Sequence, residues 1–364
     1  MRSSPRQLEQ EPPGTGWFSP DYATARTRFR QMALNRGARL DSLPVDGYGP
    51  AGEPLTIDIA WLGHPRADRV LLHTSGLHGV EGFAGSAIQL ALLGALPVIP
   101  PGGAIALVHA LNPWGMAHGR RTNARNVDLN RNVLAEGEPY EGSHWLYPTL
   151  DPLLNPASAP AEDAFLLRLA GAALRHGYRR VMQAIAEGQH AYPDGLFYGG
   201  AGPEPEPRLF LEWASAHLAG TEYVFALDVH SGLGARGRDT VFVHRALQAT
   251  PATALKVALD RPPERAGAPY AVYGGLETGL AAVLGRTPAD FVVQELGTRP
   301  PWAVLAALRD ENRWFHHGRH VTDHPAPARL RETFCPSDPS WRERAVALGR
   351  ELGERAMHHA FSGL

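Results

Sequence analysis

The 364-residue sequence predicts an α/β protein with three layers, in which helices cover both faces of a mixed, mainly parallel sheet. Along the middle of the chain, apolar runs of strand length alternate with segments of helical periodicity. These runs lack a polar face, as strands do when a sheet is covered on both sides. Hydrophobic residues make up 44% of the chain, enough for a substantial core. We therefore expect a single α/β/α domain.

The first half of the chain is expected to form a helix, a strand hairpin and a β-α-β unit. Tyr22, Ala25 and Phe29 recur at helical spacing. Ile57 and Ile59 alternate with other residues, as in a strand. In chain order, the expected segments are a helix over 21–35, strands over 40–45, 55–62 and 69–74, a helix over 82–96 and a strand over 103–110.

The second half of the chain contributes further strands and the terminal helices. The expected segments are helices over 161–186 and 209–218, strands over 223–232, 239–244 and 290–298, and helices over 300–315 and 340–361. Gly188 would end the first of these helices, because glycine is common just beyond a helix end. We expect the main domain over 18–325, with an N-terminal extension over 1–17 and a C-terminal connection and helix over 326–364 packed on it.

Composition and charge exclude several classes of partner. The net charge of -2 and the pI near 6.8 argue against binding to nucleic acid or to an anionic membrane. A single cysteine, Cys335, excludes an intramolecular disulfide framework and a cysteine-based zinc site. The first residues lack the apolar core of a secretory signal, and no run approaches the roughly 18 apolar residues of a membrane span. These features predict a cytoplasmic protein, and the composition, with Lys256 as the only lysine, favours a bacterial source.

A histidine and a glutamate follow the strand over 69–74. His78 and Glu81 stand three residues apart after a glycine turn, where the pattern becomes helical. Positions three apart share a face of a helical turn, so both side chains can reach one ion. An imidazole and a carboxylate are two of the three ligands of a common catalytic zinc site. The alternative is a solvated pair on a helix face, but ligands of open α/β sheets bind at such strand ends.

A third ligand and a carboxylate occur at two later strand ends. His230 ends the apolar strand over 223–232 and fits the distant third ligand of a catalytic zinc site. His73 and His118 are alternative ligands. Glu295 interrupts the apolar strand over 290–298, and a buried carboxylate there either pairs with a cation or acts as a general base beside a metal-bound water. The ligand set suits Zn²⁺ and also other divalent ions.

The loop over 120–132 is the most polar part of the chain, with four Arg and four Asn in thirteen residues. It is either a solvated loop or an anion-binding loop, since Arg and Asn together match a carboxylate. A second pattern, G-x-G-x-x-G over 232–237, resembles a dinucleotide-binding turn, but the strand expected over 239–244 replaces the helix that such a site needs. The sequence lacks G-x-S-x-G and H-E-x-x-H, which disfavours α/β-hydrolase and zincin chemistry.

Four of these motifs, in this order, resemble zinc carboxypeptidases of the M14 type. They are His78-Gly79-Val80-Glu81, the loop from Asn112-Pro113 to Asp128-Leu129-Asn130-Arg131, Asp228-Val229-His230-Ser231, and Gln294-Glu295-Leu296-Gly297. The helix over 18–29 and the loop over 188–200 are similar to the M14-like branch of unknown function called DUF2817. The resemblance covers roughly residues 70–300, and implies a zinc carboxypeptidase-like fold with a metallohydrolase domain over 18–325.

The resemblance also implies a role for each matching residue. His78, Glu81 and His230 would hold one Zn²⁺ per chain, and Asp128 would orient His78. Glu295 would take the proton of the metal-bound water and pass it to the leaving amine.

Four further residues would contact the substrate. Arg121 would polarise the scissile carbonyl, with Arg120 as its nearest alternative. Asn130 and Arg131 would hold the substrate carboxylate. Tyr273 would cap the substrate, with Tyr270 as an alternative.

The implied activity is zinc-dependent hydrolysis of an amide bond next to a free carboxylate, on a small peptide. One alternative is a deacylase of N-acyl amino acids, similar to aspartoacylase or succinylglutamate desuccinylase, which would use the same ligands. Another is a non-catalytic module that binds a metal or a peptide. Glu295 and Arg121 argue against that module, because a binding protein needs neither a general base nor a cation for an oxyanion. The sequence leaves the oligomeric state open.

Overall fold

The computed structural model describes residues 14–262, 264–265, 271–321 and 323–364. Within these residues, eight strands form one mixed sheet in the order β1-β2-β4-β3-β5-β8-β6-β7. The strands are β1 (Arg39–Tyr48), β2 (Pro54–Gly63), β3 (Arg69–Ser75), β4 (Gly103–His109), β5 (Tyr223–Gly232), β6 (Asp239–Gln248), β7 (Glu264–Arg265) and β8 (Ala289–Gly297). The four central strands β4, β3, β5 and β8 are parallel, and β2 and β6 flank them in the antiparallel sense.

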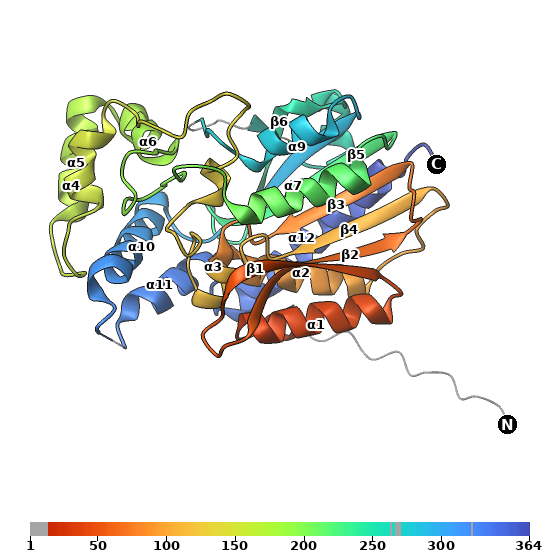
Figure 1. Cartoon of the computed structure of the whole chain (residues 1–364), viewed down its shortest axis with the longest axis horizontal. Helices are drawn as coiled ribbons and strands as arrows, with labels where there is room; N and C mark the ends of the chain where they lie inside the picture. The colour runs from red at the N-terminus through yellow and green to blue at the C-terminus, as the bar shows by residue number, and fades with distance from the viewer. Residues whose placement is uncertain (1–13, 263, 266–270, 322) are drawn as a thin grey trace.

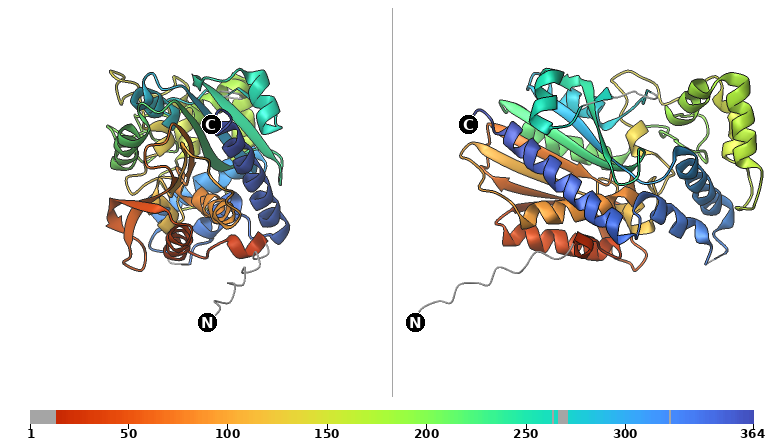
Figure 2. Two further views of the ribbon diagram at one scale, coloured as in Figure 1. Left: turned by 90° about the vertical axis from the view of Figure 1, so that its right-hand side faces the viewer. Right: turned by 180° about the vertical axis from the view of Figure 1, so that it is seen from behind.

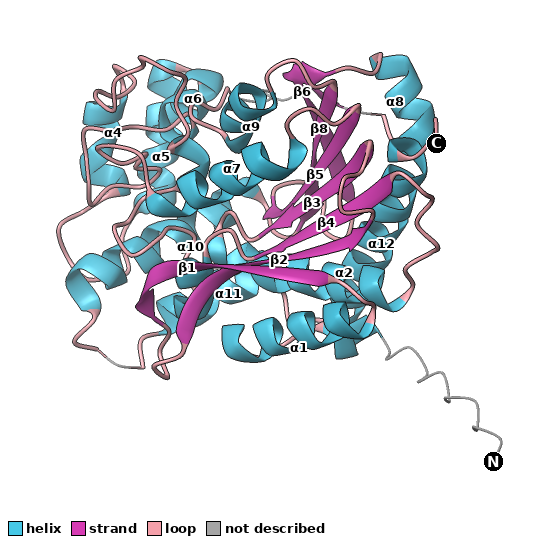
Figure 3. Cartoon of the chain, turned by 45° about the vertical axis from the view of Figure 1, so that its right-hand side comes forward, coloured by secondary structure: helices cyan, strands magenta, loops and turns pink. Residues whose placement is uncertain are grey.

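Helices cover both faces of this sheet, as Figures 1 and 3 show. The helices are α1 (Tyr22–Asn35), α2 (Gly82–Gly94), α3 (Pro113–His118), α4 (Tyr147–Leu154), α5 (Phe165–His176), α6 (Tyr178–Ala186), α7 (Pro205–Leu218), α8 (Ala252–Leu259), α9 (Leu276–Leu284), α10 (Pro301–Arg313), α11 (Pro325–Phe334) and α12 (Pro339–Ala360). The predicted α/β class, with a mixed and mainly parallel sheet between helical layers, is confirmed.

One helical layer contains α1, α2 and α12, and α7 and α9 lie on the opposite face (Figures 1 and 2). Glycines on α12 explain its close packing on α2. A Cβ atom at Gly349 would lie 2.4 Å from Ile88 Cδ1, and one at Gly353 would lie 2.8 Å from Leu92 Cδ2. Larger residues at these two positions would push the helices apart. None of the helices in the described ranges is both long and apolar enough to cross a membrane.

The hairpin and the first helix form as the sequence predicts. β1 and β2 pair in the antiparallel sense, with Leu43 opposite Ile57. α1 begins after Asp21, whose carboxylate accepts a hydrogen bond of 2.7 Å from the Thr24 amide, the expected arrangement for a helix N-cap. The strand expected after the G-x-G-x-x-G pattern is β6, so no helix follows that turn.

The single helix expected over 161–186 is wrong. The segment forms two helices, α5 and α6, which are separated by Gly177. Gly177 has φ +87°, a conformation outside the helical region that glycine adopts readily and other residues rarely do. The sequence has helical periodicity on both sides of Gly177, so it gave no sign that the helix is interrupted there.

The parallel strands bring their carboxyl ends to one edge of the sheet. β3, β5 and β8 point the same way, and His230 of β5 is directly opposite Glu295 of β8. The chain leaves β3 just before His78. Helices α4, α5, α6, α10 and α11 lie beyond this edge, at the left of Figure 1. Side chains that are far apart in the sequence therefore meet between the sheet edge and these helices.

Candidate metal centre and active site

Glycines shape the turn that carries His78 and Glu81. Gly76 has φ +69°, and a Cβ atom there would lie 3.1 Å from the Ala110 Cα atom. A Cβ atom at Gly79 would lie 2.2 Å from the backbone of Gly115. The backbone can therefore turn sharply after β3 and pack closely against α3. His78 then precedes a short 3₁₀ helix that ends at Glu81, and both side chains are buried.

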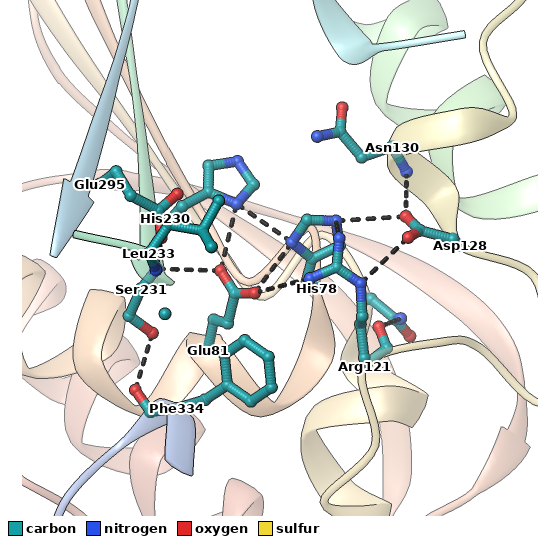
Figure 4. A network of polar contacts seen from close by, with 12 residues as sticks. His78, Glu81, Arg121, Asp128, Asn130, His230, Ser231, Leu233, Glu295 and Phe334 are labelled. Carbon is teal, nitrogen blue, oxygen red and sulfur yellow. Dashed lines mark hydrogen bonds and ion pairs between the residues drawn. The ribbon is translucent and has the colours of Figure 1, made fainter. Parts of the chain in front are cut away.

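Three potential ligands, two imidazoles and one carboxylate, converge at this point (Figure 4). The distance between His78 Nδ1 and Glu81 Oε1 is 3.0 Å, and His230 Nδ1 lies 3.1 Å from both Glu81 Oε2 and His78 Nδ1. Bonds of about 2.0–2.2 Å to a tetrahedral zinc ion would place such atoms roughly 3.3–3.5 Å apart. The observed separations are within a few tenths of an ångström of that spacing. The geometry and chemistry of the three donors therefore fit a divalent metal ion.

In the described part of the chain, these three residues form the one cluster of His, Cys, Asp or Glu side chains with such geometry. The two alternative histidines lie elsewhere. His118 Nε2 is 3.0 Å from the Tyr48 carbonyl oxygen, and His73 is fully buried beside Gln89. The structure thus brings His78, Glu81 and His230 together and leaves His73 and His118 out.

Each imidazole also contacts an aspartate through its other nitrogen. His78 Nε2 lies 3.1 Å from Asp128 Oδ1, and His230 Nε2 lies 2.7 Å from Asp228 Oδ2. An imidazole that donates its Nε2–H to a carboxylate presents the lone pair of Nδ1 to the cluster, which is the form that binds a metal. Thr74 Oγ1 donates to the other oxygen of Asp228 at 2.7 Å and holds that carboxylate in place.

Asp228 is a site residue that the sequence prediction missed. A signal was present, because Asp228 and His230 are two residues apart on a strand, so that their side chains emerge on the same face. The prediction placed Asp128 beside His78, and the structure gives His230 the same kind of partner.

The charges of the cluster depend on one another. Burial alone would raise the pKa of Glu81, but His78 and His230 hold it well below its usual value. Burial likewise favours the neutral form of His230, yet Asp228 and Glu81 raise the pKa of His230 well above its usual value. Without a metal ion, these carboxylates therefore favour the protonated form of His230. A metal ion must displace that proton before it can bind to Nδ1.

Glu295 lies beside the cluster at the end of β8 (Figure 4). Its Oε1 atom accepts a hydrogen bond of 2.8 Å from the Leu233 amide. Burial, reinforced by the negative charge of Glu81, raises the pKa of Glu295 to about 7. A carboxylate whose pKa is near neutrality is well matched to general-base work.

Arg121, and not Arg120, reaches this cluster. Arg121 Nη1 donates to Glu81 Oε1 at 3.1 Å, and Arg121 Nε donates to Asp128 Oδ2 at 3.0 Å. Arg120 is buried, and its Nε atom donates to Glu311 Oε1 at 2.7 Å. The structure therefore places Arg121 in the pocket and commits Arg120 to an internal ion pair.

A pocket of about 350 Å³ opens next to the cluster, and Asn130 and Arg131 line it together with the three potential ligands. Arg131 Nε and Nη2 donate to the Ala186 carbonyl oxygen at 3.0 and 2.6 Å, which fixes the buried guanidinium. Asn130 Oδ1 accepts a hydrogen bond of 3.3 Å from the Leu276 amide. Both residues therefore occupy defined positions on the pocket wall.

Tyr273 lies away from this pocket. Its side chain is 59% exposed, and it is not among the described residues that line the pocket. Tyr270, its alternative, falls outside the described residues. The structure thus assembles the expected site residues His78, Glu81, Arg121, Asp128, Asn130, Arg131, His230 and Glu295, and does not bring Tyr273 to them.

The fold and the site define a class of protein, an α/β protein with a buried His-Glu-His cluster suited to a divalent metal ion. A family model described as "Protein of unknown function (DUF2817)" matches residues 18–348. The chain belongs to this family, which confirms the membership predicted from the sequence. A search of curated proteins found no match.

Solved structures provide more distant similarities. One is a proposed metallopeptidase from Shewanella denitrificans OS217, at 14% identity and a TM-score of 0.43, covering 98% of this chain and 99% of that chain. Carboxypeptidase A from Helicoverpa armigera matches at 15% identity and a TM-score of 0.45, over 94% and 74%. Murein-tripeptide amidase MpaA from Escherichia coli O157 matches at 19% identity and a TM-score of 0.39, over 77% and 95%. Similarity at this level does not assign an activity.

Proposed function

We propose that this protein is a zinc-dependent hydrolase that cleaves an amide bond next to a free carboxylate. The observation that carries the proposal is the convergence of His78 Nδ1, His230 Nδ1 and the Glu81 carboxylate within 3.1 Å of one another. Asp228 lies 2.7 Å from the far nitrogen of His230, and the far nitrogen of His78 lies near both Asp128 Oδ1 and Arg121 Nη2, so each imidazole is fixed with Nδ1 toward the cluster. Two imidazoles and one glutamate are the ligands of several catalytic zinc sites that keep a fourth position for water.

Glu295 and Arg121 supply the acid-base and electrostatic parts of the reaction. When bound, a divalent ion supplies Lewis acidity that lowers the pKa of a coordinated water. Glu295 would accept a proton from the attacking water and would transfer it to the leaving amine, a task that suits its raised pKa. Arg121, fixed by Glu81 and Asp128, stabilises negative charge on the oxygen of the scissile carbonyl.

Asn130 and Arg131 hold the free carboxylate of the substrate. They stand on the pocket wall next to the metal ligands, and Arg and Asn donors suit a carboxylate. A small peptide and an N-acyl amino acid both place such a carboxylate next to an amide bond. Both are therefore candidate substrates, and the carboxypeptidase reaction on a peptide is the one we propose.

Metal content and hydrolysis test this proposal together. We expect about one zinc per chain in the purified protein by mass spectrometry, and loss of that zinc in His78→Ala. The matched control is His118→Ala, which removes a histidine outside the cluster and should keep the metal. No stoichiometric divalent metal, even after reconstitution with zinc, would contradict the mechanism.

A panel of small peptides and N-acyl amino acids separates the candidate reactions. Release of C-terminal residues supports the carboxypeptidase reaction, and release of acyl groups supports a deacylase. A zinc-loaded protein that binds these compounds and hydrolyses none of them would be a non-catalytic binding module. That result would overturn the proposed activity and leave the metal site intact.

A further inference from the structure

A polar pair lies in the same pocket as the metal ligands, on two other elements of the fold. His244 of β6 and Glu277 of α9 both line the pocket, and His244 Nδ1 lies 3.3 Å from Glu277 Oε1. The side chains of His244 and Glu277 remain 20% and 13% exposed. The proposed reaction uses neither residue, so the position of the pair in the pocket requires another explanation.

The sheet register places this pair at a distance from the reaction centre. Alternate residues of a strand share a face, so Glu295 and Phe291 of β8 both face the pocket. Across the antiparallel pairing, Phe242 of β6 is opposite Val293 of β8. The His244 ring then packs edge-on against Phe291, with ring centroids 5.3 Å apart. The floor therefore runs from Glu295 over apolar side chains to His244.

The length of this floor limits the side chain that can fill it. Four residues along a strand span roughly 13 Å, so Phe291, against which the His244 ring packs, lies about that far from Glu295 along β8. A scissile carbon next to Glu295 places the Cα atom of the C-terminal residue roughly 5–6 Å along this path. After a hydrogen bond of about 3 Å at the far end, roughly 4–5 Å remains, so a flexible side chain of lysine length can reach the end of the floor and the longer side chain of arginine does not fit.

The carboxylate of Glu277 is positioned at the end of this apolar floor. Glu277 is in the first turn of α9, and a Cβ atom at Gly275 would lie 2.2 Å from its Oε2 atom. Glycine at this position leaves room for the carboxylate to fold over the helix start. Among the described residues, only His244 makes a polar contact with Glu277, so one carboxylate oxygen remains for a ligand.

We propose that Glu277, oriented by His244, selects substrates whose C-terminal side chain ends in a primary amine. A carboxylate at the end of an apolar pocket forms a charge-assisted hydrogen bond with such a group, and an apolar side chain leaves the carboxylate without one. This inference rests on the proposed function, because it names the substrate class of the same site. Arg131 supplies the opposite charge nearer the ligands, for the substrate carboxylate.

The test compares, on the zinc-loaded protein, two substrates that differ only in a terminal amine. We expect kcat/KM for an N-acyl dipeptide ending in lysine to exceed that for the norleucine analogue, which lacks the amine, roughly 10- to 100-fold. Glu277→Gln should bring this ratio close to one, and Glu277→Arg should shift the preference toward C-terminal glutamate. Glu212→Gln, which changes an exposed carboxylate on α7, is the matched control and should keep the wild-type ratio.

Binding of the free amino acids separates this inference from the proposed function. Calorimetry on the metal-free protein should show tighter binding of lysine than of norleucine, with the difference lost in Glu277→Gln. Such binding without any hydrolysis would support the selectivity of the pocket while the proposed reaction fails. Hydrolysis with a lysine-to-norleucine ratio near one, or with an unchanged ratio in a folded Glu277→Gln, would overturn the inference and leave the proposed reaction standing.

Discussion

Replacing Glu295 with glutamine should have opposite effects on activity and on stability. Glutamine keeps the size of the side chain, and its carbonyl oxygen can still accept the 2.8 Å hydrogen bond from the Leu233 amide. It cannot accept the proton of a water molecule. We expect kcat to fall roughly 10²- to 10⁴-fold, the usual contribution of a general base, while the zinc content stays near one per chain.

The effect of Glu295→Gln on stability follows from the raised pKa of the carboxyl group. Its pKa is about 7 in the folded protein, against 4.5 as the ordinary value. Between these values the folded state binds more protons than the unfolded state, so the free energy of unfolding of the wild type falls as pH rises. Above pH 7 the wild type has lost the whole of this contribution to its free energy of unfolding, which amounts to at most about 3 kcal/mol. Glutamine does not titrate and avoids this loss.

Denaturant unfolding of the metal-free proteins at pH 5 and pH 8 measures this effect. Glu295→Gln should be more stable than the wild type at pH 8, and this advantage should shrink to under about 1 kcal/mol at pH 5. An equal difference at both pH values would refute the assignment of a raised pKa to Glu295. Activity within tenfold of the wild type in a zinc-loaded Glu295→Gln would refute its role as the base.

Three other predictions concern the metal site and the helix break. Asp228→Asn should weaken zinc binding roughly 10- to 100-fold in chelator competition, because a neutral amide accepts the His230 hydrogen bond more weakly than the carboxylate does and makes the imidazole a weaker ligand; unchanged affinity would argue against that role. Zinc binding should release about one proton from His230 near neutral pH and weaken as pH falls, which calorimetry in buffers of different ionisation enthalpy measures. Gly177→Ala should lower the free energy of unfolding by about 1 kcal/mol or more, because its φ of +87° suits glycine alone. The control Gly171→Ala, inside α5 with open space around its Cα atom, should instead raise it by about 0.5–1 kcal/mol.

The metal ligands could be predicted from sequence because each lies at a strand end or follows one. The apolar strands before His78 and His230 are easy to identify, and the carboxyl ends of parallel strands meet at one edge. Glu295 was visible for the same reason, as a charge inside an apolar strand. The order of the strands along the chain and their parallel direction were therefore sufficient to predict that these residues lie in one site.

Other site residues depend on contacts that sequence order does not reveal. His244 and Glu277 meet only because α9 packs beside β6, and a sequence shows no such neighbour relation.

The helix α11 was also missed, because Pro325 and Pro327 give its start the composition of a linker. Proline is tolerated in the first turn of a helix, where the backbone amides have no helical partner, so these residues begin the helix instead of preventing it.

The pairing of His230 with Glu295 on neighbouring central strands separates the reaction from the choice of substrate. Main-chain hydrogen bonds in the middle of the sheet set the distance between this ligand and the base, so side-chain changes at the periphery leave that distance unchanged. His244 and Glu277 belong to a strand nearer the edge of the sheet and to a surface helix. Substitution of His244 and Glu277 should therefore change the choice of substrate and leave the reaction itself in place.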